Sequence, residues 1–172
     1  MYDYDSCSEI VLVKRAKKQD TKAFSKLYET VYQDMYHYAL YMLKHSQDAE
    51  DVVSATVISA FENIVKLRKD ERFRSWIFKI LTNQCKRKLM ANHRQIPTDE
   101  EPDLLVHHDF SATHDVKEAL SELSDEERLI ISLSVFCGYN SKEIGEQLSL
   151  NPNTVRSKRS RALGKMEGIL QG

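Results

Sequence analysis

In the N-terminal half of the chain, apolar residues recur every three or four positions, which is the period of an amphipathic α-helix. Four stretches show this period and are predicted to be helices: residues 10–16, 24–42, 49–64 and 73–89. Their apolar stripes can bury one another, so we expect a compact helical bundle that ends near Arg94. Ser46 is the predicted N-cap of the third helix, because Asp48, Glu50 and Asp51 follow it, where the helix dipole favours acids.

The pattern resumes after residue 113 in a second, smaller unit. Ser124 and Glu127 have the spacing of a capping box, and Gly138 is the expected stop of the helix that they begin. Asn140 is predicted to cap a short helix. Asn151 and Pro152 then begin another over residues 152–166, since proline is favoured at the first helical position. Two short helices and a tight turn, with a basic second helix, predict a helix-turn-helix.

Glycine is scarce, and the first one is Gly138. Tight β-turns need Gly or Asn-Gly, so the sequence favours an all-α fold and excludes Gly-rich phosphate loops. Residues 95–113 contain two prolines and no sustained period, and we expect a flexible acidic linker there. The predicted organisation is two small helical domains, residues 1–94 and 114–172, on a tether that could span up to about 65 Å at ~3.4 Å per residue.

Charge is distributed unevenly along a chain whose net charge is only -1. Residues 66–94 hold ten bases against two acids, residues 95–128 hold two bases against eleven acids, and residues 155–167 hold five bases against one acid. Two basic surfaces separated by an acidic stretch predict two contacts with a polyanion.

Other classes of protein find little support in the sequence. The three cysteines are far apart, which favours unpaired thiols in a reducing compartment. His107, His108 and His114 lack the ligand spacing of a metal site, so no metal or other cofactor is expected. No apolar run approaches the ~18 residues of a membrane span, and no secretory signal is visible, so we expect a cytoplasmic protein with no membrane insertion. No pattern of catalytic residues is found, and the chain is not expected to be an enzyme.

The helix over residues 152–166 carries the first candidate DNA-binding face. Val155, Ala162, Leu163 and Met166 form its predicted apolar stripe, and Arg159 falls inside that stripe. The opposite face combines arginines, which can read guanine bidentately, with hydroxyls that can hold phosphates. The candidate residues of this helix are Thr154, Arg156, Ser157, Lys158, Ser160 and Arg161.

The second candidate face lies on the helix over residues 73–89. Its apolar stripe leaves Lys79, Asn83, Lys86 and Arg87 on one outer side, where an amide among cations suits a base edge flanked by phosphates. Trp76 and Cys85 lie on the apolar stripe and are expected in the core. The candidates of this segment are Arg72, Arg74, Trp76, Lys79, Asn83, Lys86 and Arg87.

The order DAEDVV, then FRSWIFKI, an acidic linker and SKEIGEQLSLNPNTVRSKRSRA resembles bacterial RNA polymerase sigma factors of the sigma-70 family, in the extracytoplasmic-function (ECF) group. The resemblance covers nearly the whole chain. It implies a transcription initiation factor that directs core RNA polymerase to promoters through regions 2 and 4 of the family. Two departures stand out: Ser54 and Ala55 replace a frequent Gln-Glu pair, and Arg159 replaces a leucine or isoleucine.

The resemblance also implies a role for each segment. Residues 46–65 would bind the clamp helices of the polymerase β′ subunit, with Asp48, Glu50 and Asp51 as candidate contacts. Residues 66–94 would melt and read the −10 element, and residues 152–166 would read the −35 element. Implied partners are core RNA polymerase, through the β′ clamp helices and the β flap, promoter DNA, and an anti-sigma factor.

Two alternatives stay open at this point. A stand-alone helix-turn-helix repressor or activator with a helical sensor domain would also use a basic recognition helix, but it would have little use for a second basic helix. A small helical enzyme or metal protein would need a constellation of polar residues that the sequence does not show.

Overall fold

The computed structural model describes residues 1–94 and 114–172, and all regular elements in these two ranges are helical. This confirms the predicted all-α class. The predicted linker, residues 95–113, lies outside the described residues. The elements are α1 (Glu9–Ala16), α2 (Thr21–Leu43), α3 (Ser46–Asn63), the 3₁₀ helices η1 (Ile64–Lys66) and η2 (Asp70–Arg72), α4 (Phe73–Arg94), α5 (His114–Ser121), α6 (Asp125–Phe136), α7 (Ser141–Leu148) and α8 (Pro152–Gln171).

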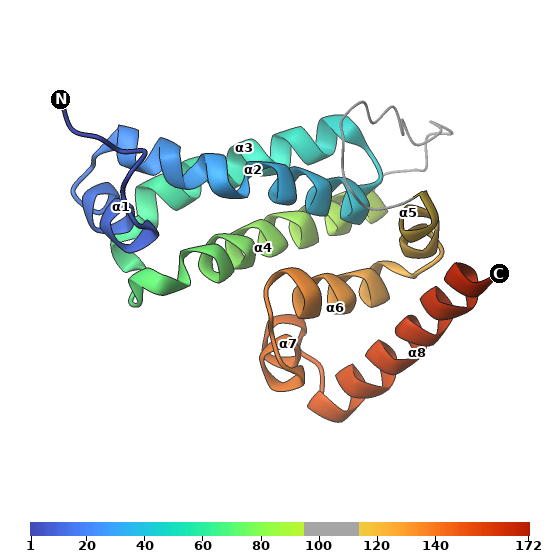
Figure 1. Cartoon of the computed structure of the whole chain (residues 1–172). Coiled ribbons are helices and arrows are strands. Elements are labelled where there is room, and N and C mark those ends of the chain that lie inside the picture. Colours follow the sequence, from blue (N-terminus) through green and yellow to red (C-terminus); the bar gives the residue numbers. More distant parts are fainter. Residues whose placement is uncertain (95–113) are drawn as a thin grey trace.

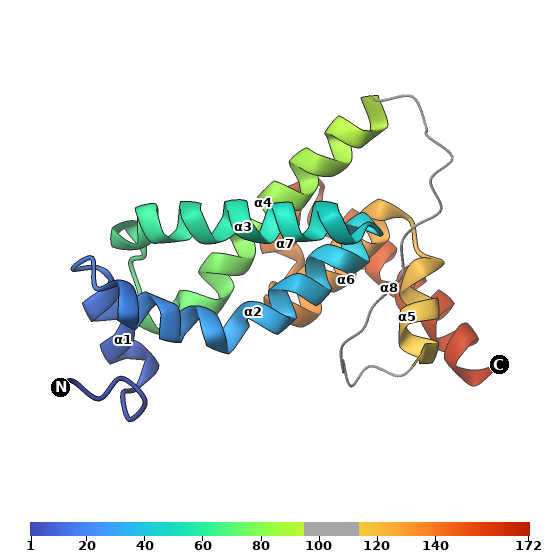
Figure 2. The same cartoon turned by 90° about the horizontal axis from the view of Figure 1, so that it is seen from above.

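Helices α1 to α4 form the N-terminal bundle (Figure 1), and α4 crosses α3 obliquely in the second view (Figure 2). Their predicted apolar stripes meet in one core. A buried hydrogen bond of 2.8 Å between the hydroxyls of Tyr38 and Thr82 joins α2 to α4 inside it. The predicted cap of α3 is wrong by one residue. His45 is the N-cap, because its Nδ1 accepts a hydrogen bond from the backbone N–H of Asp48 at 3.3 Å, and Ser46 is already helical.

Helices α5 to α8 form the second unit, and their ends are set locally. The capping box of Ser124 and Glu127 and the cap of Asn151 before Pro152 are both confirmed. Asn140 caps α7 as expected and forms a second capping box with Glu143. The turn between α7 and α8 requires the glycine at position 145, because a Cβ atom there would lie 2.5 Å from the carbonyl oxygen of Leu150. This close approach gives the helix-turn-helix its tight corner.

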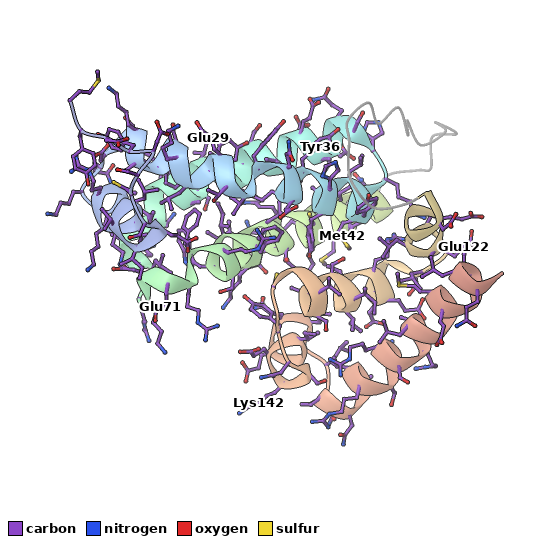
Figure 3. The ribbon with its side chains drawn as sticks, viewed as in Figure 1. Glu29, Tyr36, Met42, Glu71, Glu122 and Lys142 are labelled. Carbon is purple, nitrogen blue, oxygen red and sulfur yellow. The ribbon has the colours of Figure 1, made fainter. Side chains whose placement is uncertain are left out.

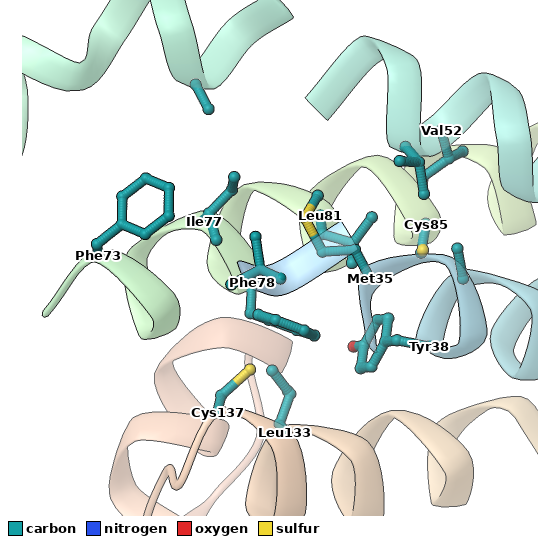
Figure 4. Packing of buried hydrophobic residues seen from close by; sticks show 14 of the residues in the cluster. Met35, Tyr38, Val52, Phe73, Ile77, Phe78, Leu81, Cys85, Leu133 and Cys137 are labelled. Atoms are coloured by element: carbon teal, nitrogen blue, oxygen red, sulfur yellow. The ribbon is translucent and has the colours of Figure 1, made fainter. Parts of the chain in front are cut away.

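The two units pack against each other through α6, which lies between α4 and α8 (Figure 1). Phe78 of α4 points toward Leu133 of α6 and toward Cys137, the residue directly after α6 (Figure 4). Phe78 is fully buried although it does not belong to the predicted stripe. The sequence pattern missed it because α4 is covered on two sides, by its own bundle and by the second unit.

Two hydrogen bonds accompany this packing. The Tyr139 hydroxyl donates to the carbonyl oxygen of Ser75 at 3.3 Å, and the Lys44 ammonium donates to that of Ser121 at 2.9 Å. Burial and the nearby guanidinium of Arg128 lower the pKa of Lys44. The units therefore share a partly polar seam in this arrangement.

Candidate nucleic-acid interface

The outer face of α8 presents the polar side chains that the sequence pattern predicts. Arg156, Ser157, Ser160 and Arg161 are all exposed, whereas Thr154 is half-buried at the start of the helix. Val155 and Ala162 are fully buried on the opposite side, against the rest of the second unit. The helix therefore displays two guanidinium groups and two hydroxyls over two turns, a combination that suits a major groove.

Asn153 is a polar residue of this face that the sequence reasoning missed. Its Oδ1 accepts a hydrogen bond from Nη1 of Arg156 at 2.6 Å, and its backbone oxygen accepts one from the Ser157 hydroxyl at 3.0 Å. An amide and a guanidinium lie side by side near the start of α8, and these are the two groups that can read adenine and guanine edges bidentately. The sequence could have indicated Asn153 as a candidate, since this residue directly follows Pro152 at the predicted start of the helix.

Two lysines of α8 are held by acids of α6. Lys158 forms an ion pair with Glu126, and Nζ of Lys165 lies 2.8 Å from Oε1 of Glu127. The Lys165 ammonium lowers the pKa of the Glu127 carboxyl. Lys158, a predicted DNA contact, is thus turned toward α6 and ties α8 to the rest of the second unit.

The predicted apolar stripe of α8 is wrong at Leu163, which is 48% exposed. At 100° per residue, Leu163 lies about 80° around the helix from Val155, whereas Met166 lies within about 20° of it and packs on the core. Arg159 is half-buried at the rim between these positions. Although Arg159 falls inside the apolar stripe predicted from the sequence, its side chain is therefore only partly buried.

The outer side of α4 carries the second predicted face. Lys79, Asn83 and Arg87 are exposed and follow one another at four-residue spacing, and Lys86 beside them is half-buried. Side chains at this spacing line one side of a helix. Cations thus flank the Asn83 amide on both sides along α4, as the sequence pattern predicts.

Arg74 and Trp76, two further candidates of this segment, are engaged in packing. Nη2 of Arg74 donates to Oδ2 of Asp34 at 2.7 Å, and the guanidinium lies 5.0 Å from the centre of the Phe78 ring. Trp76 is half-buried, and its ring centre lies 6.3 Å from that of Phe73. Arg72, just before α4, is exposed.

The acids predicted to bind a polymerase differ in their surroundings. Oδ2 of Asp48 accepts a hydrogen bond from the Asn92 amide at 3.1 Å, and Oδ1 lies 3.1 Å from Nζ of Lys88. Glu50 and Asp51 are exposed on α3. Ile58 is 61% exposed on the same helix, an apolar residue that the sequence reasoning did not single out.

Ile58 lies seven positions after Asp51, which places both on one side of α3 together with Ser54, itself exposed. This side combines a carboxylate, a hydroxyl and an apolar side chain open to solvent. Figure 3 shows the side chains of the described residues as sticks on the ribbon.

Other kinds of site have no counterpart in the described ranges 1–94 and 114–172. No group of three or more His, Cys, Asp or Glu residues there could hold a metal ion, and no helix there combines the length and apolar character that a membrane crossing needs. Cys7, Cys85 and Cys137 are free thiols. Burial raises the pKa of the Cys137 thiol to about 12.

The fold and the arrangement of the basic side chains first define a class of protein. It is a helical protein of two units that presents two basic faces, one of them on a helix-turn-helix. Comparison with known proteins gives the family. Residues 27–95 match Sigma-70 region 2, and residues 113–166 match Sigma-70, region 4. RNA polymerase sigma factor SigV of Bacillus subtilis (strain 168) is 32% identical over 154 residues, 87% of this chain and 93% of that protein. The ECF RNA polymerase sigma-E factor of Escherichia coli (strain K12) is 26% identical over 186 residues, 97% of this chain and 96% of that one.

Two solved structures share the fold. The sigma factor RpoE in complex with the anti-sigma factor NepR from Bartonella quintana superposes with a TM-score of 0.68 at 20% identity, covering 87% of this chain and 98% of that one. CnrH in complex with the cytosolic domain of CnrY gives a TM-score of 0.62 at 20% identity, covering 95% of this chain and 97% of that one.

The chain belongs to the sigma-70 family of RNA polymerase sigma factors, in the ECF group. It is a transcription initiation factor, and the stand-alone repressor or activator is not favoured.

Proposed function

We propose that this chain binds core RNA polymerase and reads two separate promoter elements, the −10 element with α4 and the −35 element with α8. The observation that carries the proposal is the pair of exposed basic faces on helices of different units, within the residues that match regions 2 and 4. The chain performs no chemistry itself in this account, because the polymerase supplies the catalytic centre. It acts in the cytoplasm, where polymerase and promoter meet.

The proposed division of labour follows from the two surfaces. The α8 face, with Asn153, Arg156, Ser157, Ser160 and Arg161, suits duplex DNA, since a helix of small and bidentate side chains fits a major groove. The α4 face suits a melted strand, because an amide flanked by cations can hold an unpaired base between two phosphates. The domain limits 1–94 and 114–172 belong to this proposal.

Core polymerase would be bound mainly through α3. Glu50 and Asp51 offer charge and Ile58 offers apolar contact on this helix, whereas Asp48 is engaged inside the bundle. We assign this surface to the clamp helices of β′, and the second unit to the β flap. Because both solved relatives named above are in complex with another protein, one of them named as an anti-sigma factor, we also propose an anti-sigma partner for this chain.

The direct test is run-off transcription with purified chain and bacterial core polymerase on a promoter library. Transcripts that start at defined promoters only when the chain is added would support the proposal. Core polymerase that gives the same transcripts with and without the chain would contradict it. A gel-shift with the same DNA and no polymerase serves as a control, because the near-neutral net charge predicts weak binding by the chain alone.

A further inference from the structure

Helix α1 is fixed to the end of the bundle at which α4 begins. Nζ of Lys17 lies 2.5 Å from Oδ1 of Asp70 in η2, and both side chains are mostly buried. Val13 and Ala16 of α1 are fully buried in the core. Both views show α1 at the same end of the molecule as the segment that joins α3 to α4 (Figures 1 and 2). This helix precedes residues 27–95, the part that matches region 2.

The surface around this contact is basic. Lys14 and Lys18 precede and follow Lys17 on one side of α1 and the turn after it, at the i, i+3, i+4 spacing of helical neighbours, and both are exposed. The exposed bases of α1, of the segment between α3 and α4, and of the turn after α1 form what we call the N-terminal basic surface: Lys14, Lys18, Lys66, Arg68, Lys69 and Arg72. None of these six bases forms an ion pair with a residue in ranges 1–94 and 114–172.

The acids of the same segments offset little of this charge. Asp70 is paired with Lys17, and Asp20 lies 2.8 Å from the guanidinium of Arg15. Glu9 and Glu71 are the remaining acids of α1, η1, η2 and their connections, and both are exposed. Six exposed bases against two exposed acids give a local field that attracts a polyanion.

We propose that the N-terminal basic surface binds promoter DNA beyond the −10 element, with Lys14 and Lys18 contacting phosphates of the strand that leaves the N-terminal end of α4. Arg72 precedes Lys79 by seven residues, two helical turns, so the basic edge of α4 continues into η2. Since α1 packs on η2, DNA that passes the start of α4 would meet the exposed bases of α1 next. This inference rests on the proposed function and adds a DNA contact outside the matched region 2.

The test is the salt dependence of promoter binding by the reconstituted holoenzyme. The double variant Lys14→Gln/Lys18→Gln removes two proposed phosphate contacts. Each contact contributes about 0.7 to the slope of log K against log salt for a single strand, and about 0.9 for a duplex. We therefore expect the slope to become shallower by about 1.4 to 1.8, and Lys14→Arg/Lys18→Arg to restore it.

The matched control is Lys22→Gln/Lys26→Gln, which makes the same change of charge on α2, where Lys26 is already paired with Asp5 and Glu29. This control should keep the wild-type slope. A wild-type slope for Lys14→Gln/Lys18→Gln would overturn the proposal, and so would a loss of affinity for core polymerase without DNA, which would indicate a protein contact instead. A wild-type holoenzyme that starts no transcription would contradict the proposed function itself, which separates the two failures.

Discussion

Nζ of Lys88 on α4 lies 3.1 Å from Oδ1 of Asp48 in the first turn of α3, so this carboxylate ties two helices of the bundle together. Asp51, one turn further along α3, is exposed, and its Oδ1 accepts a hydrogen bond of 3.1 Å from the side-chain amide of Gln47 on the same helix. Two acids of one short sequence motif therefore have different roles: Asp48 stabilises the fold, and Asp51 is available to a partner.

The first prediction separates these two roles. Asp48→Ala should lower the free energy of unfolding by about 1–2 kcal/mol, because it removes a partly buried ion pair and the hydrogen bond from Asn92. Asp51→Ala should leave stability within ~0.5 kcal/mol of wild type and weaken binding to core polymerase. Urea unfolding and a polymerase pull-down measure the two effects. If Asp48→Ala unfolds at the wild-type urea concentration, Asp48 has no structural role.

The second prediction concerns Arg156 on the recognition helix. Arg156→Ala should cost about 1–3 kcal/mol at one base pair of the −35 element and relax the preference there. Lys158→Ala is the control, because Lys158 is paired with Glu126 and should leave base preference unchanged. Competition binding of the holoenzyme to promoters with single-base changes measures both. Equal relaxation by the two variants would reject a specific role for Arg156.

The third prediction tests whether Asn153 acts together with Arg156. Because the two side chains are joined by a hydrogen bond of 2.6 Å, Asn153→Ala should relax preference at the same or the adjacent base pair. The effects of Asn153→Ala and Arg156→Ala should be non-additive, with an interaction energy on the order of 0.5–3 kcal/mol. A double-mutant cycle on −35 binding gives this energy. Strict additivity would show that the pair does not act as one reading unit.

The fourth prediction concerns Asn83 on α4. Asn83→Ala should change the preference for an unpaired base in a −10 oligonucleotide and leave binding to duplex −35 DNA intact. Gln84→Ala removes an amide of similar chemistry from the neighbouring, half-buried position and should change neither. Equal losses on both kinds of DNA would point to a defect in folding rather than to lost recognition.

The fifth prediction uses the cysteines to test the seam between the two units. Burial raises the pKa of Cys137 to about 12 and that of Cys85 well above the usual range, so both should be almost wholly thiol, and unreactive, at pH 8. Cys7 is half-buried near the N-terminus and should react first with an aromatic disulfide reagent.

Separation of the units exposes Cys137, which faces Phe78 of α4 (Figure 4), but leaves Cys85 inside the N-terminal bundle. Binding to core polymerase should therefore make Cys137 reactive if the two units part to reach two promoter elements. Continued protection of Cys137 in an active holoenzyme would show that the packing at α6 persists.

How far the sequence predicts this structure depends on the range of the interaction concerned. The caps at Ser124 and Asn151 were predictable because capping involves residues two or three positions away. The exposed faces of α4 and α8 were predictable because helical periodicity decides them. The burial of Phe78 was not, because α6 covers it from another unit.

The same limit applies within the candidate site. Asp48 and Lys158 have the charge of binding residues, but Lys88 and Glu126, both distant in the sequence, engage them. Leu163 was misplaced because a basic helix has few apolar residues from which to locate the centre of its stripe. The sequence could therefore predict which helix faces outward, but not which charges on it already have a partner.

Selection of active promoters from a randomised library by the reconstituted holoenzyme, for wild type, Arg156→Ala and Asn83→Ala, tests whether α8 and α4 read two separate promoter elements. We expect two separate blocks of sequence preference for the wild type, with only the upstream block relaxed by Arg156→Ala and only the downstream block by Asn83→Ala. A single palindromic block, which is the sign of a dimeric helix-turn-helix regulator, or relaxation of both blocks by either variant, would contradict the reading of two elements by two helices.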